Sequence, residues 1–172
     1  MQLVAKGRFI ENLWRNYEPL EGQLLPEFSI VPAAWLFNHT RAHPALPSML
    51  GVSIVADDLV LVPSELYTML TLMVIIFTAT GDGRGFSVAA RLRDGGYRGE
   101  LRARGPLIAD QYLHLRACGF DSVEIPDDIA ARHTAPDWFK AYRRFPLRYQ
   151  ESGGALGSIL MRRHAVTGAK DS

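Results

Sequence analysis

The residues of this chain that could do chemistry are concentrated between Asp82 and Asp121, where most of them follow short stretches typical of strands. The segments are Asp82-Gly83-Arg84-Gly85-Phe86-Ser87, Gly99-Glu100-Leu101-Arg102-Ala103, Gly105 and Asp110-Gln111. In α/β proteins, polar side chains at the carboxyl ends of strands usually mark a binding site. We therefore expect the functional site to lie among these residues.

The glycines in this region favour an anionic ligand. We expect helices to begin near Gly85 and Gly105, where free backbone N–H groups and the helix dipole attract negative charge. Sulfite, sulfate, phosphate or a carboxylate would fit such a site. The residues expected to contact the anion are Arg84, Gly85, Ser87, Arg102, Gly105 and Gln111.

Three acidic residues are candidates for general acid or base catalysis beside an arginine-bound substrate: Asp82, Glu100 and Asp110. Glu100 and Arg102 are separated by one apolar residue, so their side chains share one face of the expected strand. Buried charges need partners, so both residues could instead belong to a structural ion network with Asp82 or Arg84. The sequence leaves the catalytic, ligand-binding and structural roles open.

Motifs for metals and cofactors are weak or missing. The glycine-rich turn lacks the spacing of a Walker loop and of a dinucleotide-binding turn. Cys118 is the only cysteine, which excludes an internal disulfide and a multi-cysteine metal site. His39 and His43 lack the glutamate of a zinc-binding helix, and we interpret them as loop or capping residues. We predict no metal ligands, and no motif implies a cofactor.

Composition and charge exclude several classes of protein. The chain has 172 residues, 48% of them hydrophobic, and a formal net charge of +1. It can therefore bury one substantial core, while its charge favours neither nucleic acid nor an anionic membrane. The longest apolar stretch, residues 66–77, is shorter than the roughly 20 residues of a membrane helix. The first residues do not resemble a secretory signal, and one cysteine fits a cytoplasmic location.

The elements that must position these residues follow a βα rhythm from Phe28 onward. Strands are predicted at 28–31, 51–56, 72–77, 100–104 and 122–125. The continuous apolar run at 72–77 is expected to be a strand covered on both faces, near the centre of the sheet. Helices are predicted at 33–38, from the glycine-rich turn to Gly95, from Pro106 to Gly119, and from Pro126 to a break at Pro136. Gly119 is expected to end its helix in a left-handed conformation.

This pattern predicts one α/β domain over residues 1–150, with a mainly parallel sheet of about five strands. A β-rich addition occupies residues 1–25, with a turn expected at Lys6-Gly7 between two short strands. Residues 151–172 are expected to be a flexible tail. Strand order is open between a doubly wound sheet and a partial TIM-like (β/α) barrel. An incomplete barrel would leave sheet edges that a homodimer could cover.

Motifs along most of the chain resemble those of a bacterial family known as domain of unknown function 934. The shared positions are Gly7-Arg8-Phe9, Trp35, Gly51-Val52, the turn at 82–87, residues 99–103, Gly105, Asp110-Gln111, Gly119-Phe120-Asp121 and Tyr149-Gln150. There are also departures, since Pro106 and Ala109 stand where the family tends to have an aspartate and an arginine. The resemblance implies an oxidoreductase involved in assimilatory sulfite reduction, working beside sulfite reductase.

Two functions follow as expectations. The first is an accessory or small-oxyanion-binding protein of sulfite reduction that holds sulfite, sulfate or phosphate or docks on sulfite reductase. The alternative is an enzyme that uses Asp82, Glu100 or Asp110 beside an arginine-bound substrate.

Overall fold

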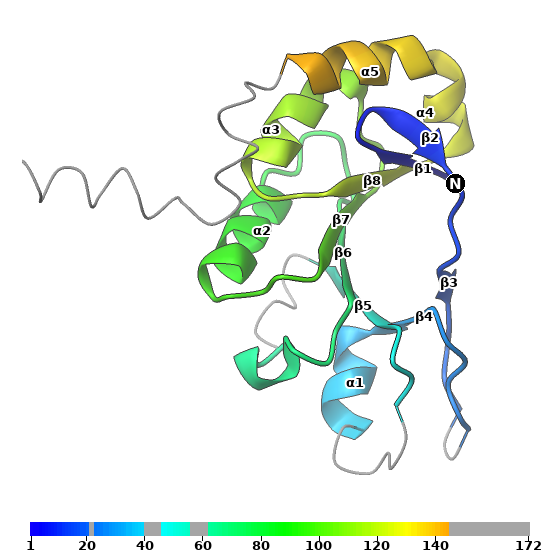
Figure 1. Cartoon of the computed structure of the whole chain (residues 1–172), viewed down its shortest axis with the longest axis vertical. Coiled ribbons are helices and arrows are strands. Elements are labelled where there is room, and N and C mark those ends of the chain that lie inside the picture. Colours follow the sequence, from blue (N-terminus) through cyan, green and yellow to red (C-terminus); the bar gives the residue numbers. More distant parts are fainter. Residues whose placement is uncertain (21–22, 40–45, 56–61, 145–172) are drawn as a thin grey trace, which may run out of the picture.

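The structure is a computed structural model that describes residues 1–20, 23–39, 46–55 and 62–144 (Figure 1). The described strands are β1 (Gln2–Ala5), β2 (Arg8–Ile10), β3 (Arg15–Asn16), β4 (Ser29–Pro32), β5 (Leu50–Val55), β6 (Leu72–Ile76), β7 (Glu100–Arg104) and β8 (Ser122–Ile125). The described α-helices are α1 (Ala33–His39), α2 (Arg84–Asp94), α3 (Tyr112–Ala117), α4 (Asp127–Arg132) and α5 (Ala135–Arg143). Two short 3-10 helices, η2 (Ser64–Leu66) and η3 (Ala109–Gln111), complete the description. The predicted mixed α/β fold is confirmed, whereas the expected tail at 151–172, His43 and Tyr149-Gln150 lie outside the described residues.

The strands form one sheet in the order β2-β1-β8-β7-β6-β5-β4-β3. From β3 to β8 each strand lies parallel to the next, and β1 pairs antiparallel with both β2 and β8. This order does not reverse as it would in a doubly wound sheet. The sheet curls like a half-barrel, with α1, α2 and α3 on its outer side and the segment from β2 to β3 crossing its open side (Figure 1).

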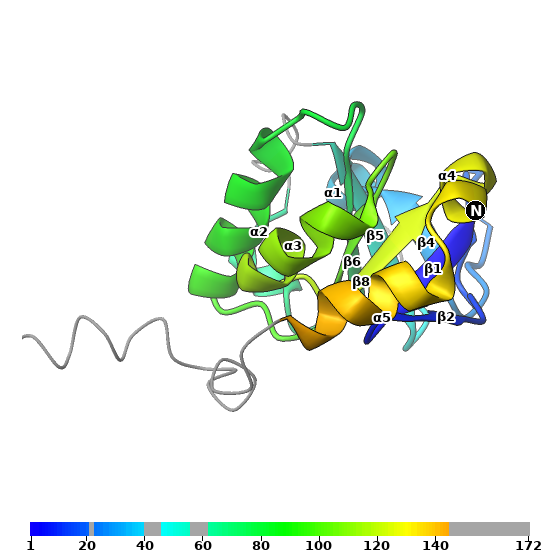
Figure 2. The same ribbon diagram turned by 90° about the horizontal axis from the view of Figure 1, so that it is seen from above.

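The central strand β6 is the continuous apolar run that the sequence predicts to be buried on both faces, and all but its last residue are buried. Met73 and Ile75 pack in the outer core with helix residues such as Leu92. Leu72 and Val74 face the inner side of the curled sheet. Figure 2 shows α2, α3 and α5 arranged around the outer side of the strands.

The inner face of the sheet has an apolar half and a polar half. Over β4 to β6, a small core forms from Trp14, Ile30, Leu72 and Val74. Over β7 and β8, the inward positions are occupied by charged and hydroxyl side chains, because they alternate with apolar residues that face the helices. The polar half is the part of the fold that matters for the site.

Two predicted helix boundaries are wrong, and each error involves a proline. Pro106 does not open a helix, because the chain stays irregular until η3 begins at Ala109. Pro136 does not break a helix, because it lies in the first turn of α5, where proline is tolerated. The break is instead at Thr134, whose backbone N–H and hydroxyl both donate to the Asp137 carboxylate.

Other local predictions are confirmed. The β1–β2 hairpin turns at Lys6 and Gly7, both of which have positive φ. Gly119 adopts a φ of 99° after α3, and the N–H of Phe120 donates to the carbonyl of Leu115 at 3.1 Å. In the described part of the chain, no helix combines the length and the apolar character needed to cross a bilayer.

Candidate functional site

The loops after β6 and β7 lie side by side at the carboxyl edge of the sheet, as we expect for parallel strands. The Gln111 side chain donates to the carbonyl of Thr80 at 2.9 Å, and the Thr80 hydroxyl donates to the carbonyl of Pro106 at 3.0 Å. Gln111 also accepts a hydrogen bond from the N–H of Ile108. The amide of Gln111 is thus engaged at both ends in holding the two loops together.

Asp82 and Arg84 form an ion pair at the start of α2. One carboxylate oxygen of Asp82 accepts from the backbone N–H of Arg84 at 3.2 Å and from its Nε at 3.0 Å. The other oxygen accepts from Arg84 Nη2 at 3.2 Å and from the Thr78 hydroxyl at 3.3 Å. Hydrogen bonds from Arg84 hold the pKa of the Asp82 carboxyl below its ordinary value. The Asp82 carboxylate therefore occupies the position in which we expect an external anion.

The two glycines of the predicted anion site pack against Phe77, which is buried at the end of β6. A Cβ on Gly85 would collide with the Phe77 ring. A Cβ on Gly105 would collide with the Phe77 carbonyl oxygen, and Gly105 also has a φ of 150°. Both positions are thus restricted to glycine by close packing within the fold.

Ser87 and Asp110, the two remaining candidates near these loops, are exposed. Ser87 lies in the first turn of α2, and Asp110 lies in η3. In the described part of the chain, neither side chain converges with Arg84 through a hydrogen bond or an ion pair.

Arg102 lies on the inner face of β7 with a side chain that is only 1% exposed. Its Nε and Nη2 donate to one oxygen of Glu100 at 3.1 and 2.9 Å. Its Nη1 donates to the Asn12 side-chain oxygen at 3.0 Å and lies 3.5 Å from Glu124. The Ser122 hydroxyl also accepts from Nε, at 3.3 Å. All three guanidinium nitrogens of Arg102 therefore have partners within the protein.

Arg104 extends this network toward the carboxyl edge of the sheet. Its Nη2 donates to Glu124 at 3.0 Å, and its Nη1 donates to the Asn16 side-chain oxygen at 2.7 Å. Arg104 Nε is buried and has no acceptor among the described residues. We call this set of residues the inner-face cluster: Asn12, Asn16, Glu100, Arg102, Arg104, Ser122 and Glu124. Its two carboxylates and two guanidinium groups balance in charge.

Arg84 and Arg102 do not share one pocket. Arg84 begins α2, which packs on the outer face of the sheet, while Arg102 alternates with Leu101 in that outer core and so points to the inner face. Glu100, at the other end of β7, also lies away from the edge loops. The structure therefore separates the predicted residues into an edge group and an inner-face group.

Several members of the inner-face cluster are not among the residues proposed from the sequence. Ser122 and Glu124 could have been found, because they alternate with apolar residues in β8 as Glu100 and Arg102 do in β7. Asn12 and Asn16 could not be predicted from the sequence, because they lie in a segment without hydrophobic periodicity. They are brought next to Arg102 and Arg104 only by the tertiary structure.

Cys118 and His114 lie on one side of α3, with Sγ 4.0 Å from Nε2. Burial raises the pKa of the Cys118 thiol, which disfavours the thiolate that a nucleophile needs. The His114 ring stacks on Phe86 at 4.3 Å. In the described part of the chain, no three histidine, cysteine or acidic residues are grouped so that they could hold a metal ion.

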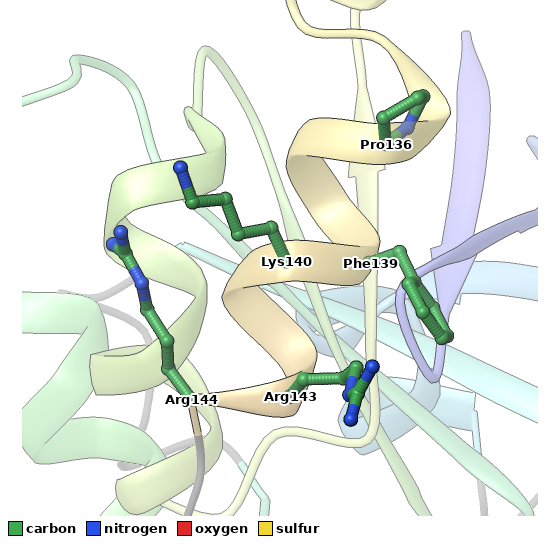
Figure 3. A pocket seen from close by; sticks show the side chains of 5 residues that line it. All are labelled: Pro136, Phe139, Lys140, Arg143 and Arg144. Carbon is green, nitrogen blue, oxygen red and sulfur yellow. The ribbon is translucent and has the colours of Figure 1, made fainter.

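The outer face of α5 is another feature that could bind a ligand. A pocket there is lined by Pro136, Phe139, Lys140, Arg143 and Arg144 (Figure 3). Figure 3 shows Phe139 and Arg143 on one side of the helix and Lys140 and Arg144 on the other. The guanidinium of Arg8, on β2, lies 5.8 Å from the centre of the Phe139 ring. We call these six residues the α5 face.

The comparisons with known proteins identify a family without a described activity. No curated protein and no solved structure matches the chain. A family model described as "Bacterial protein of unknown function (DUF934)" matches residues 51–157, which include the strands and helices from β5 to α5. Since this match covers more than half of the sequence, the chain belongs to the DUF934 family of bacterial proteins.

Proposed function

We propose that this protein is an accessory protein of assimilatory sulfite reduction, and that it acts by binding a partner protein. The link to sulfite reduction rests on the resemblance of its motifs to the DUF934 family. The mode of action rests on how its charged side chains are used. The arginines near the expected catalytic or anion-binding site are paired with carboxylates, whereas the cations of the α5 face have no acidic partner among the described residues.

The observation that carries the proposal is this contrast between two sets of cations. Arg102 and Arg104 bind carboxylates of the inner-face cluster, and Arg84 binds Asp82. The α5 face carries Arg8, Lys140, Arg143 and Arg144, and among the residues that the structure describes none of these four has an ion pair with an acidic residue. Exposed and unpaired charge is what a binding surface needs for recognition and for steering a partner.

Binding of sulfite, sulfate or phosphate at the start of α2 is less well supported. The Asp82 carboxylate already takes the Arg84 backbone N–H and two of its guanidinium nitrogens. An incoming anion would have to displace it or lie beside a like charge, which is unfavourable.

The enzyme alternative finds no specific support in the geometry. Asp82 is held ionised by Arg84, and Glu100 accepts hydrogen bonds from Arg102 and Ser122. Asp110 is exposed and stands apart from the arginines. A general acid or base is usually placed so that its pKa lies near the working pH, beside a bound substrate.

Gene deletion tests the proposal directly. A bacterium that carries this gene should lose growth, or grow more slowly, on sulfate and on sulfite after the gene is deleted. It should grow normally on sulfide or cysteine, which enter metabolism after sulfite reduction. Growth on sulfate and sulfite that is unaffected by the deletion would refute the proposed function.

A further inference from the structure

We propose that the α5 face docks an acidic segment of a partner protein, with an aromatic or aliphatic side chain of that segment packing against Phe139. This inference deepens the proposed function and rests on it for the biological setting. The chemistry of the partner is argued only from α5 and the residues around it.

The sequence of α5 gives the helix two different faces. Trp138 and Ala141 face the protein and are buried, with Trp138 packed edge-on against Tyr112 at 5.5 Å. Phe139 and Lys140 lie on the other side and are exposed. Positions i, i+3, i+4, i+7 and i+8 from Pro136 form one continuous stripe of the helix surface, and these are the residues that line the pocket.

The helix is fixed firmly enough to present this stripe as a rigid platform. A Cβ on Gly7 would lie 2.7 Å from the Cβ of Tyr142 and 2.9 Å from the Cα of Phe139, so the β1–β2 turn is in close contact with α5. The N–H of Gly7 also donates to the Tyr112 hydroxyl at 3.2 Å. A preformed surface loses little conformational freedom on binding.

The charge of the α5 face selects an acidic partner. Four cations share the α5 face with Phe139, and Asp137 is the only acid of α5. That carboxylate is turned to the start of the helix, where it accepts two hydrogen bonds from Thr134. Phosphate binding alone would leave unexplained the exposed Phe139 ring beside Arg8 and Arg143, since exposed aromatic residues near arginines are typical of protein interfaces.

The residues that follow α5 in the sequence do not fit the face by charge. Residues 145–172, which follow Arg144, contain four basic and two acidic side chains. A segment with an excess of positive charge would be repelled by the four cations. We therefore assign the complementary segment to another molecule.

The size of the face limits the length of the segment. A nine-residue helix such as α5 is roughly 14 Å long. An extended peptide covers that length with about four to five residues. A short acidic stretch around one apolar residue is therefore sufficient, and it would lie between the two columns of side chains in Figure 3.

Fluorescence anisotropy with labelled synthetic peptides tests the inference on the full chain. One peptide carries glutamates and aspartates around a central tryptophan, and a second carries the same acids around a central serine. The wild-type protein should bind the tryptophan peptide more tightly, and added salt should weaken both complexes. Equal binding of the two peptides, or no binding, would overturn the inference.

Two variants locate the binding surface. Arg143→Glu should lower the affinity for the tryptophan peptide by about tenfold or more. Phe139→Ala should abolish the preference for tryptophan over serine. The matched control is Arg91→Glu, because Arg91 is also an exposed arginine in the last turn of a helix, on α2. Equal loss of binding in Arg143→Glu and Arg91→Glu would contradict the assignment to the α5 face.

Three further outcomes would assign the face to another occupant and overturn the proposal. Single-stranded RNA, or vesicles of phosphatidylglycerol, could bind more tightly than the tryptophan peptide and lose binding in Arg143→Glu. A homodimer seen by light scattering could likewise disappear in that variant.

The docking proposal and the proposed function can be refuted separately. Should the deletion strain grow normally on sulfate while the peptide still binds through Arg143, only the link to sulfite reduction falls. Should the deletion impair growth on sulfate while Arg143→Glu restores it fully, only the docking surface falls.

Discussion

At the scale of single residues, glycines that looked suited to an anion site are required by packing. Gly105 combines a φ of 150° with a Cβ position that would overlap the Phe77 carbonyl, and backbone cannot move aside as a flexible side chain can. Gly83, in the neighbouring loop, has no atom within 4 Å of its Cβ position and has a negative φ of −77°. The two positions thus offer a matched comparison.

We predict that Gly105→Ala lowers the free energy of unfolding by about 2 kcal/mol or more, because it combines backbone strain with a steric overlap. Gly83→Ala should change the free energy of unfolding by less than about 1 kcal/mol. Such a change would be stabilising where alanine reduces the conformational entropy of the unfolded chain. Urea denaturation followed by circular dichroism measures both. Equal stability of the two variants would show that Gly105 is not constrained as described.

The pair of Asp82 and Arg84 makes a prediction about pH. Since Arg84 favours the ionised carboxyl, the pKa of Asp82 should lie below the ordinary aspartate value of about 3.9. The stabilisation is then fully present at neutral pH and is lost as the pH falls through the pKa of the folded state. Carbon-detected NMR titration should show this low pKa, and Arg84→Ala should return it toward the ordinary value. An unchanged pKa in Arg84→Ala would contradict the pairing.

At the scale of elements, the pattern of hydrophobic residues, alternating in β7 and β8 and continuous in β6, was the most informative signal in the sequence. It predicted β6, β7 and β8 and the burial of β6, because strands covered on both faces need continuous apolar runs. The prolines caused the errors in the predicted helix boundaries. A proline in the first turn of a helix cannot be told from a proline that breaks a helix unless the N-cap residue is identified. The Thr134-x-x-Asp137 spacing is the local signal that would have placed the start of α5.

The candidate site could be predicted only in part, for a topological reason. Parallel strands bring their carboxyl-end loops together, which is why the contacts between the Thr80 and Gln111 loops follow from the sequence pattern. The face toward which Arg102 points depends on the side of the sheet that the helices cover. Asn12, which accepts a hydrogen bond from Arg102, lies 90 residues away along the chain, and no local sequence pattern predicts such a contact.

The inner-face cluster makes a prediction at this scale. Arg102→Ala leaves Glu100 without its arginine and removes one of the two arginines that contact Glu124, whose side chain is 5% exposed. Breaking a buried ion network by removing one partner typically lowers the free energy of unfolding by about 3–5 kcal/mol, and we expect Arg102→Ala to lower it by an amount in that range. Arg91→Ala, at an exposed position, should have a free energy of unfolding within about 0.5 kcal/mol of that of the wild type. A loss below 1 kcal/mol in Arg102→Ala would show that the network is not structural.

At the scale of the whole molecule, the segment from β2 to β3 closes the open side of the curled sheet. Trp14 is 9% exposed and lies over Gly51 and Ile30, while its neighbour Leu13 is 55% exposed. We predict that Trp14→Ala lowers the free energy of unfolding by about 3 kcal/mol, because it uncovers the inner apolar core. Leu13→Ala should have little effect. Thermal unfolding measures both, and equal melting temperatures would mean that this segment does not complete the fold.

In this protein the paired charges contribute to stability, and we assign partner binding to the α5 face. The most direct measurement is the growth on sulfate of a deletion strain that expresses single variants at equal protein level. We predict that the isosteric Asp82→Asn, at the edge loops, restores growth as wild type does, and that Arg143→Glu, in the α5 face, does not. Restored growth with Arg143→Glu together with failure of Asp82→Asn would contradict the account.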